Sequence, residues 1–249
     1  MKFCIVIPHY DHVEQFTEML PRLAGHPLPL LIVDDHSPSS AFARLEEAAL
    51  TAIPEAMLIR LDRNQGKGGA VRAGLKAARA AGYSHAVQVD ADGQHDLADI
   101  AALTAESERY PRHIVCGQPV FDRDIPSVRY YARYLTLALS WVESLSMQIR
   151  DAMCGFRVYP LEQTLALCEG ARLGSRMDFD PEILVRAVWE GIGLRFVPVH
   201  VGYPEEGASH FHYFRDNLLI SWMHTRLLLA MLPRSPYLLS RKWRSRRKS

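Results

Sequence analysis

AVQVDADGQHD, residues 86–96, is the stretch of this 249-residue chain that decides its fold. An apolar run passes here directly into two aspartates, Asp90 and Asp92. A short apolar run that ends in polar and turn-forming residues is typical of a buried strand leaving a sheet. Runs of the same kind occur earlier, at residues 3–7, 30–33 and 57–61, and later strands are expected at 114–115 and 194–199.

Segments with helical periodicity separate the early runs. Residues 13–23, 42–50, 70–81 and 97–108 carry apolar side chains at helical spacing. Strands that alternate with helices predict an α/β fold, with a Rossmann-like, mainly parallel central sheet and helices on both of its faces. No Pro-, Gly- or Ser-rich linker divides the chain, so we expect a single domain. Residues 1–212 would form its body, and residues 213–249 would add an amphipathic helix and a polybasic tail.

The polar residues that follow the four apolar runs should meet at one edge of the sheet. In an open parallel sheet, ligands bind beyond the carboxyl ends of the strands. The polar segments are HYDH after the first run, DDHS after the second, DRNQGKGG after the third and DADGQH after the fourth. Aspartate, lysine and glycine together at such an edge predict a site for an anionic ligand that binds with a metal ion.

Asp90 and Asp92 are the candidate metal ligands. Two carboxylates two residues apart, at the point where a strand becomes a loop, can face one divalent cation, and Gln94 can add a neutral oxygen. Oxygen ligands suit Mg²⁺ or Mn²⁺, which complete their coordination with water and phosphate oxygens. The alternative is structural, with Asp92 or Asp96 capping the helix expected at 97–108.

Two further strand ends carry candidate binding residues. Asp35 can accept hydrogen bonds from a nucleoside, or it can belong to an Asx turn that leads to Ser37. Residues 64–69, NQGKGG, form a Gly-rich turn that opens a helix and brings Lys67 near a phosphate group. This turn fits neither GxxxxGK[ST] nor GxGxxG, which disfavours a P-loop kinase and an ordinary dinucleotide-binding dehydrogenase.

The ordered set of motifs resembles that of the family 2 glycosyltransferases. The matching segments are IVIPHY, LLIVDDHS, RNQGKGGAVRAGL, AVQVDADGQHD, DAMCGFRVY and FDPEIL. The dolichol-phosphate-mannose and polyisoprenyl-phosphate glycosyl synthases are the branch that the chain resembles most. The resemblance implies a GT-A fold, a UDP- or GDP-linked sugar donor, a divalent metal ion, and transfer with inversion at the anomeric carbon.

The resemblance also implies roles for individual residues. Pro8, Tyr10 and Asp35 would hold the nucleoside, and Lys67 would lie near the donor. Asp90, Asp92 and Gln94 would hold the metal ion and the diphosphate. Asp151 and Arg157 match a family motif, and they either shape the site around donor and acceptor or form a buried ion pair.

An acid at residues 178–180 is the candidate general base. An acceptor alcohol needs a base, whereas a phosphate acceptor is already anionic. Asp180 lies where the family often presents an acid to the acceptor, and Asp178 is the second candidate. The alternative is that Asp180 caps a helix that has Pro181 as its first residue.

The sequence departs from the family pattern at a candidate phosphate contact. GQP at residues 117–119 replaces a Gly-Ser-Arg motif, so Arg123 or Arg129 is expected to substitute for the missing arginine. His210 and His212 are expected in a loop over the site, with one of them near the diphosphate.

The basic residues are concentrated at the end of the chain. Six of the 29 Lys and Arg lie in the last nine residues, which leaves 23 against 28 Asp and Glu. Wide apolar faces at residues 127–150 and 214–232, followed by this tail, predict contact with a membrane surface and a lipid-linked or hydrophobic acceptor. The alternative is that these helices cover the sheet or pack a dimer. Nucleic acid is not expected as a partner, because the basic patch is confined to the tail.

The remaining sequence features point to the cytoplasm. We expect neither a secretion signal nor a spanning helix, and the four widely spaced cysteines indicate reduced thiols. The prediction is therefore a peripheral protein on the cytoplasmic face of a membrane. A non-catalytic nucleotide-sugar-binding scaffold and a nucleotidyltransferase are the alternatives to a glycosyltransferase.

Overall fold

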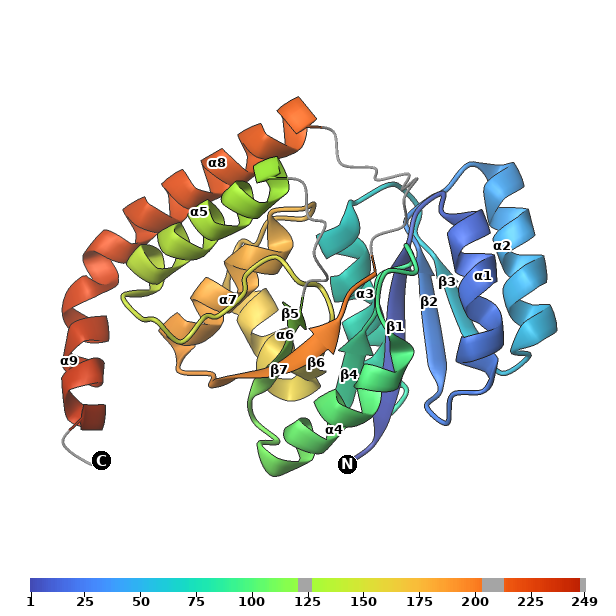
Figure 1. Cartoon of the computed structure of the whole chain (residues 1–249), viewed down its shortest axis with the longest axis horizontal. Helices are drawn as coiled ribbons and strands as arrows, with labels where there is room; N and C mark the ends of the chain where they lie inside the picture. The colour runs from blue at the N-terminus through green and yellow to red at the C-terminus, as the bar shows by residue number, and fades with distance from the viewer. Residues whose placement is uncertain (121–126, 203–212, 247–249) are drawn as a thin grey trace.

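A seven-stranded sheet lies at the centre of the computed structural model, which describes residues 1–120, 127–202 and 213–246 (Figure 1). The strands lie in the order β3-β2-β1-β4-β6-β5-β7. Their bounds are Phe3–His9 (β1), Leu30–Asp34 (β2), Met57–Arg60 (β3), His85–Gln88 (β4), Ile114–Val120 (β5), Arg157–Pro160 (β6) and Leu194–His200 (β7).

Most strand pairs are parallel, which confirms the predicted sheet. β1 is parallel to β2 and to β4, β2 is parallel to β3, and β5 is parallel to β7. β6 was not predicted, and it runs antiparallel to both β4 and β5. Its start is therefore at the edge of the sheet where β1, β2 and β4 end.

Helices connect the strands. Their bounds are Val13–Ala24 (α1), Ser39–Ala52 (α2), Lys67–Ala80 (α3), Ile100–Arg109 (α4), Ser127–Ser144 (α5), Leu161–Gly170 (α6), Phe179–Glu190 (α7), Tyr213–Met231 (α8) and Ser235–Arg246 (α9). Two short 3-10 turns precede α4 and α9, at Leu97–Asp99 and Leu232–Arg234. The long stretch predicted from residue 127 to 150 is helical only as far as Ser144.

The helices cover both faces of the sheet, as predicted, because the side chains of each strand alternate between two cores. Cys4 and Val6 of β1 point into the core formed with α3, α6 and α7. Ile5 and Ile7 point into the opposite core, formed with α1, α2 and α4. In Figure 1, α1 and α2 stand at the β1–β3 end of the molecule, and α5, α8 and α9 lie at the other end.

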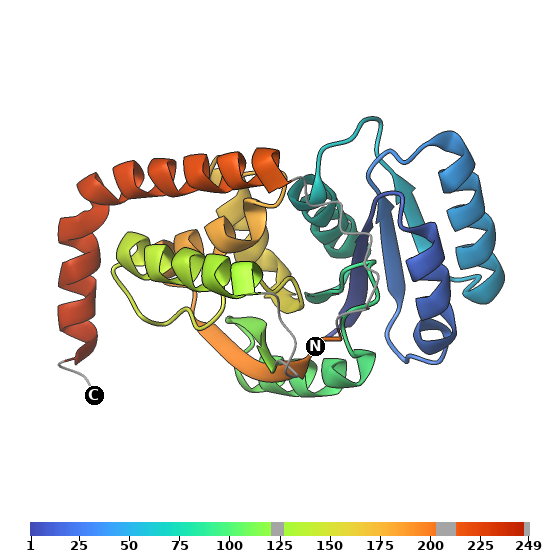
Figure 2. The ribbon, with the colours of Figure 1, turned by 45° about the horizontal axis from the view of Figure 1, so that its top comes forward.

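α5 and α8 pack side by side, and the chain turns sharply from α8 into α9 (Figure 2). The face of α5 that contacts α7 and α8 is polar: Ser140, Glu143 and Ser144 are buried there. His224 of α8 lies with Nδ1 2.6 Å from Oε1 of Glu143. Within the part of the chain that the structure describes, no helix is long and apolar enough to cross a membrane.

The sequence pattern assigned no secondary structure to the predicted basic tail, and the structure shows a helix from Ser235 to Arg246. Arg241 donates hydrogen bonds to the backbone oxygens of Val188 and Trp189, at the end of α7. Leu238 of α9 is buried in the core. The first basic residue of the tail is thus a helix cap, while the side chains of the other five lie outside the described residues.

Candidate active site

The candidate site lies at the sheet edge where β1, β2 and β4 end and β6 begins. Because β6 is antiparallel to β4, Arg157 pairs with Gln88 in the sheet. The residues just before β6, including Gly155, therefore lie beside Asp90. The start of α7 approaches from the other side, where the backbone oxygen of Ser175 accepts a hydrogen bond from Gly69 N.

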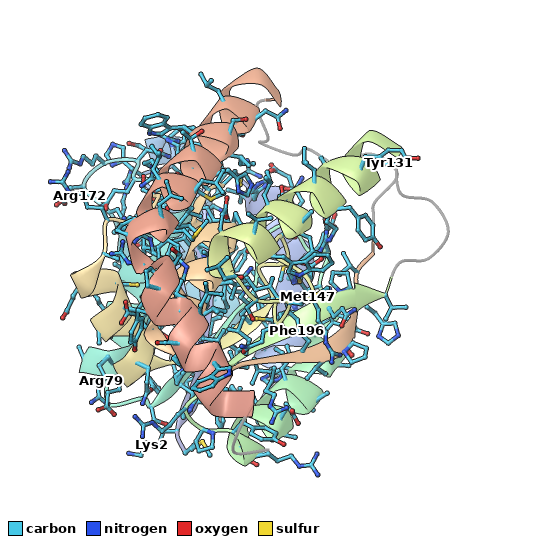
Figure 3. All side chains as sticks on the ribbon, turned by 90° about the vertical axis from the view of Figure 1, so that its left-hand side faces the viewer. Lys2, Arg79, Tyr131, Met147, Arg172 and Phe196 are labelled. Atoms are coloured by element: carbon cyan, nitrogen blue, oxygen red, sulfur yellow. The ribbon has the colours of Figure 1, made fainter. Side chains whose placement is uncertain are left out.

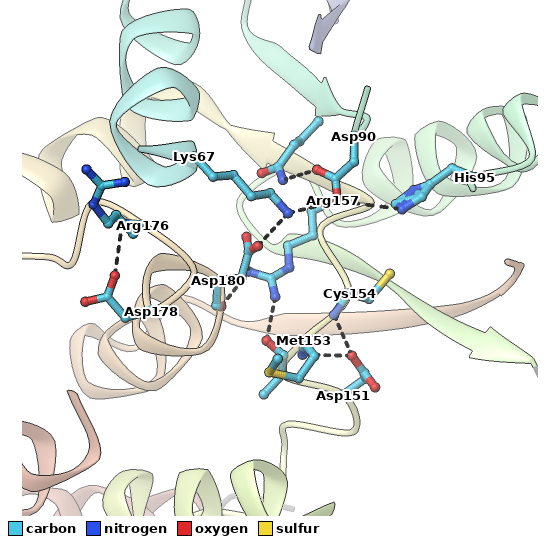
Figure 4. Close-up of polar contacts among 12 residues, drawn as sticks. Lys67, Asp90, His95, Asp151, Met153, Cys154, Arg157, Arg176, Asp178 and Asp180 are labelled. Carbon is cyan, nitrogen blue, oxygen red and sulfur yellow. Dashed lines mark hydrogen bonds and ion pairs between the residues drawn. The ribbon is translucent and has the colours of Figure 1, made fainter. Parts of the chain in front are cut away.

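Lys67 connects two of the predicted site residues (Figure 4). Its Nζ lies 2.8 Å from Oδ2 of Asp90 and 2.8 Å from Oδ2 of Asp180. Burial alone would lower the pKa of Lys67, but the charges of Asp180 and Asp90 reverse this effect and raise the pKa. Lys67 is therefore a fixed positive charge between two carboxylates.

The pKa values of Asp90 and Asp92 move in opposite directions. Burial raises the pKa of a carboxyl group, but the Lys67 ammonium and His95 more than offset this at Asp90, and its pKa is lowered. At Asp92, burial and then the negative charge of Asp90 raise the pKa. The negative charge of Asp90 is thus balanced by Lys67, whereas the negative charge of Asp92 is unfavourable in the site without a bound cation.

This asymmetric pair fits a divalent cation. Asp92 Oδ1 accepts a hydrogen bond from Gln94 N at 3.1 Å, whereas Oδ2 forms no hydrogen bond or ion pair with the described residues. The described parts of the chain hold no group of three or more His, Cys, Asp or Glu that could enclose a metal ion. A cation here would therefore bind the two carboxylates and take its other ligands from solvent or substrate.

The loop that carries these residues is anchored on both sides. Oδ1 of Asp96 accepts from Ala98 N, so Asp96, and not Asp92, caps the turn that precedes α4. Gly202 N donates to the backbone oxygen of Gln94 at 2.9 Å, just after β7 ends. The capping alternative for Asp92 is thus not needed to explain how the helix begins.

A buried network behind Asp90 was not predicted as a unit. Arg157 is fully buried; its Nη1 donates to the backbone oxygen of Asp180 at 2.8 Å and lies 3.4 Å from Tyr159 Oη. Tyr159 Oη donates to Gln88 Oε1, and Gln88 Nε2 donates to Asp90 Oδ1 at 3.2 Å. The period-two spacing of Gln88 with Asp90, and of Arg157 with Tyr159, is the sequence signal that could have identified this network.

His95 completes the surroundings of Asp90. Its Nε2 lies 3.9 Å from Oδ2 of Asp90, and its ring lies 4.7 Å from that of Phe156. Burial lowers the pKa of His95, and the two nearby aspartates oppose this only in part. Sequence reasoning assigned no role to His95.

Asp35 holds the Gly-rich turn. Its two carboxylate oxygens accept hydrogen bonds from Gln65 N at 2.6 Å and Gly66 N at 2.7 Å. Gly66 has φ +82°, a conformation that favours glycine, and it precedes α3 directly. Of the other residues predicted to bind the nucleoside, Pro8 is buried in β1 and Tyr10 is exposed.

The three acids predicted on the acceptor side, Asp180, Asp178 and Asp151, all form ion pairs or hydrogen bonds within the protein. Asp180 is in the first turn of α7, not its cap as the alternative had it, since the helix begins at Phe179. Its Oδ1 is 3.8 Å from Arg157. Asp178 Oδ1 accepts from Arg176 N at 3.0 Å, and Asp178 Oδ2 lies 3.8 Å from Arg226.

Asp151 pairs with Arg133 of α5, and its Oδ1 accepts from Met153 N and Cys154 N. The suggested ion pair between Asp151 and Arg157 is therefore wrong, because each is paired elsewhere. Arg123, His210 and His212 lie outside the described residues, as does the side chain of Arg129.

Comparison with known proteins finds relatives among the glycosyltransferases. The family model described as glycosyl transferase family 2 matches residues 4–164. Dolichyl-phosphate beta-glucosyltransferase of Dictyostelium discoideum is 27% identical over 199 residues, 76% of this chain and 59% of that protein. Polyprenol monophosphomannose synthase of Mycolicibacterium smegmatis is 29% identical over 223 residues, 82% of this chain and 79% of that protein.

A solved structure has the same fold. It is glucosyl-3-phosphoglycerate synthase from Mycobacterium tuberculosis in complex with Mn²⁺, UDP and phosphoglyceric acid, with a TM-score of 0.63 at 14% identity. The likeness covers 92% of this chain and 78% of that one. It confirms the GT-A architecture expected from the sequence.

Proposed function

Because the chain belongs to glycosyl transferase family 2, we propose that it transfers a sugar, with inversion, from a UDP- or GDP-linked donor to a polyprenyl phosphate. The observation that carries the proposal is the sheet edge where Lys67, Asp90, Asp92 and Asp180 converge. An anionic diphosphate that binds with a divalent cation fits this arrangement of charges. The names of the two relatives, which speak of dolichyl phosphate and a polyprenol monophosphomannose, support the acceptor class.

Asp90 and Asp92 would hold Mg²⁺ or Mn²⁺, and Gln94 is close enough in sequence to contribute. A bound ion would supply Lewis-acid stabilisation of the negative charge that develops on the leaving diphosphate. Burial and, after it, repulsion by Asp90 raise the pKa of Asp92, and this supports the assignment because a cation would relieve the repulsion. Pro8, Tyr10 and Asp35 would bind the nucleoside, Asp35 by supporting the turn at Gly66.

The engaged acids favour a phosphate acceptor over an alcohol. A general base must reach the acceptor and accept its proton, and a carboxylate already held by cations or backbone donors is not free to do so. Asp180 faces Lys67 and Arg157, Asp151 faces Arg133, and Asp178 is held by backbone and Arg226. A phosphate oxygen is already ionised near neutral pH. It would attack the anomeric carbon while the bond from this carbon to the diphosphate breaks, and the electron pair would leave with the diphosphate.

A panel of UDP- and GDP-sugars with Mn²⁺ or Mg²⁺ tests the donor. A single donor should stabilise the wild-type protein in a thermal-shift assay and should not stabilise Asp92→Asn. Product formation is then measured with undecaprenyl phosphate and, as the matched control, with the free alcohol undecaprenol. We expect transfer to the phosphate alone, with an inverted anomeric configuration by NMR. Transfer to undecaprenol but not to its phosphate would contradict the proposal. If no donor stabilises the protein, the proposal is contradicted, whereas donor binding without any transfer would favour the non-catalytic scaffold.

The outer surface of α5, α8 and α9 supports membrane contact. Its apolar side chains are at least half exposed: Tyr134, Leu135 and Val142 on α5, Leu218, Trp222 and Leu229 on α8, and Tyr237, Leu239 and Trp243 on α9. Figure 3 views the end of the molecule that these helices cover, with Tyr131 labelled on α5 and Met147 labelled just beyond the end of this helix. Trp and Tyr on an apolar surface next to basic residues are typical of helices that lie in a bilayer interface.

Co-sedimentation with vesicles tests this contact. Wild-type protein should sediment with vesicles that contain an anionic lipid, and Trp222→Asp should weaken binding strongly. Leu50→Asp is the matched control, because Leu50 is an exposed leucine on α2, at the far end of the molecule. Equal loss in both variants, or none in either, would contradict the assignment of this surface.

A further inference from the structure

Both oxygens of Asp90 already have partners. Gln88 Nε2 lies 3.2 Å from Oδ1, and Lys67 Nζ lies 2.8 Å from Oδ2. A divalent ion that bound Oδ2 would come within a few ångströms of the ammonium group. Like charges at such a separation repel each other strongly when they are shielded from water.

Lys67 is also needed in its position to balance the negative charges of Asp90 and Asp180. Asp90 and Asp180 are largely withdrawn from solvent, and buried carboxylates require a counter-charge. Arg157 lies no closer than 3.8 Å to the Asp180 carboxylate, and its shortest contacts go to backbone oxygens. His95 lies 3.9 Å from Asp90. Among the described side chains, Lys67 is thus the cation in direct contact with both carboxylates.

We propose that Lys67 is a resident cation that occupies the Asp90 side of the metal site until the substrate arrives, and that it competes with the divalent ion for Asp90. The inference rests on the proposed function and deepens it. The ion alone binds weakly, because it must displace the Lys67 contact. A nucleotide diphosphate supplies negative charge for both the ion and the ammonium group, so ion and nucleotide bind tightly only together. Throughout, Lys67 keeps its contact with Asp180.

The test measures Mn²⁺ binding without any turnover. Free Mn²⁺ is quantified by its EPR signal as MnCl₂ is titrated into protein cleared of metal with EDTA. Lys67→Met should bind Mn²⁺ on the order of ten- to a hundredfold more tightly than wild type, since the competing charge is gone. Lys76→Met is the matched control, because Lys76 is an exposed lysine on the same helix. It should bind as wild type does. Asp90→Asn in the Lys67→Met background should abolish the gain, which assigns it to Asp90.

Two further readouts complete the test. In EDTA, Lys67→Met should melt below wild type, and Mn²⁺ should raise its melting temperature more than it raises that of wild type. Addition of the nucleoside diphosphate that stabilises wild type, UDP or GDP, should tighten Mn²⁺ binding strongly in wild type and less in Lys67→Met.

Mn²⁺ affinity in Lys67→Met that is equal to or below that of wild type would overturn the proposal. So would a Lys67→Met protein that gains no folded signal at any Mn²⁺ concentration. Failure of the proposed function would be distinct from either result, because wild type would then bind no nucleotide with or without metal.

Discussion

Gly155 packs directly against the contact between Lys67 and Asp90, and it carries the sharpest prediction. A methyl group built there would lie 2.7 Å from Asp90 Oδ2 and 2.8 Å from both Lys67 Nζ and Gln88 Nε2. Ordinary contacts begin at 3.4 Å, so in a Gly155→Ala protein Asp90 Oδ2 must retreat by about 0.7 Å and the two nitrogens by about 0.6 Å. Gly155 does not have a positive φ, so the backbone itself accepts alanine.

The expected loss is chiefly one of function. A displacement of 1 Å in a catalytic site costs on the order of a hundredfold in rate, so about 0.6 to 0.7 Å predicts roughly a tenfold lower kcat/KM for the donor. This corresponds to about 1.4 kcal/mol of transition-state stabilisation. Crowding should lower the free energy of unfolding by about 1 to 3 kcal/mol.

The assay compares kcat/KM for the donor with the free energy of unfolding from urea titration. Gly170→Ala is the control, since a methyl group there meets nothing within 4 Å, and it should leave kcat/KM unchanged. A Gly155→Ala protein with wild-type kcat/KM would refute the reasoning. It would mean that the contacts among Lys67, Asp90 and Gln88 can lengthen without consequence.

Three further changes test other parts of the structure. Arg157→Met should lower the free energy of unfolding by about 3 to 5 kcal/mol in urea titration, because it removes a fully buried cation from its partners; a loss below about 1 kcal/mol would contradict this. Burial lowers the pKa of His85 below 6.5. The free energy of unfolding should therefore be fully retained above pH 6.5 and should decrease as the pH falls below this value. In thermal unfolding, His85→Gln should show a shallower decrease than wild type. An equally steep fall in both proteins would exclude His85 as its source. Arg241→Gln should cost about 1 kcal/mol in urea titration, because the last backbone oxygens of α7 lose a charged donor, and an unchanged midpoint would show that water replaces it.

The parallel part of the fold was predictable because its strands are apolar runs that end in polar residues. Residues 3–7 and 86–89 show this pattern plainly, and so Asp90 and Asp92 could be assigned to a sheet edge in advance. β6 could not, because it has only four residues and begins with a buried arginine, Arg157. Its polar side chains are tolerated in the core because they bind one another and the Asp180 backbone.

The start of α7 was predicted incorrectly, because the sequence offers two equivalent start signals for this helix. Asp178 and Asp180 both precede Pro181 closely, and either can begin a helix. The structure begins α7 at Phe179, with Asp178 bound to the backbone of Arg176. Partner choice could not be predicted either: Asp151 and Arg157 are close in sequence, yet Arg133 of α5 comes nearer to Asp151.

The tail shows that composition can hide a packing role. Its many basic residues predicted only a charged surface segment for membrane contact, whereas Arg241 binds the end of α7 and Leu238 is buried. Only the position of α7 in the folded protein makes this contact possible, and no local pattern in the tail encodes it.

The orientation of α5 has a consequence for how the protein behaves when it is alone in water. Because its polar side chains, Glu143 among them, are already bound within the protein, the helix cannot rotate to hide Leu135 and Val142. Such a rotation would bury apolar groups but strand a carboxylate. The exposed apolar surface of α5 is therefore a permanent property of the folded chain. In buffer without lipid or detergent we expect it to promote self-association that increases with protein concentration. If the proposed membrane contact is right, bilayers or mild detergents should reverse this self-association and leave the site at the sheet edge intact.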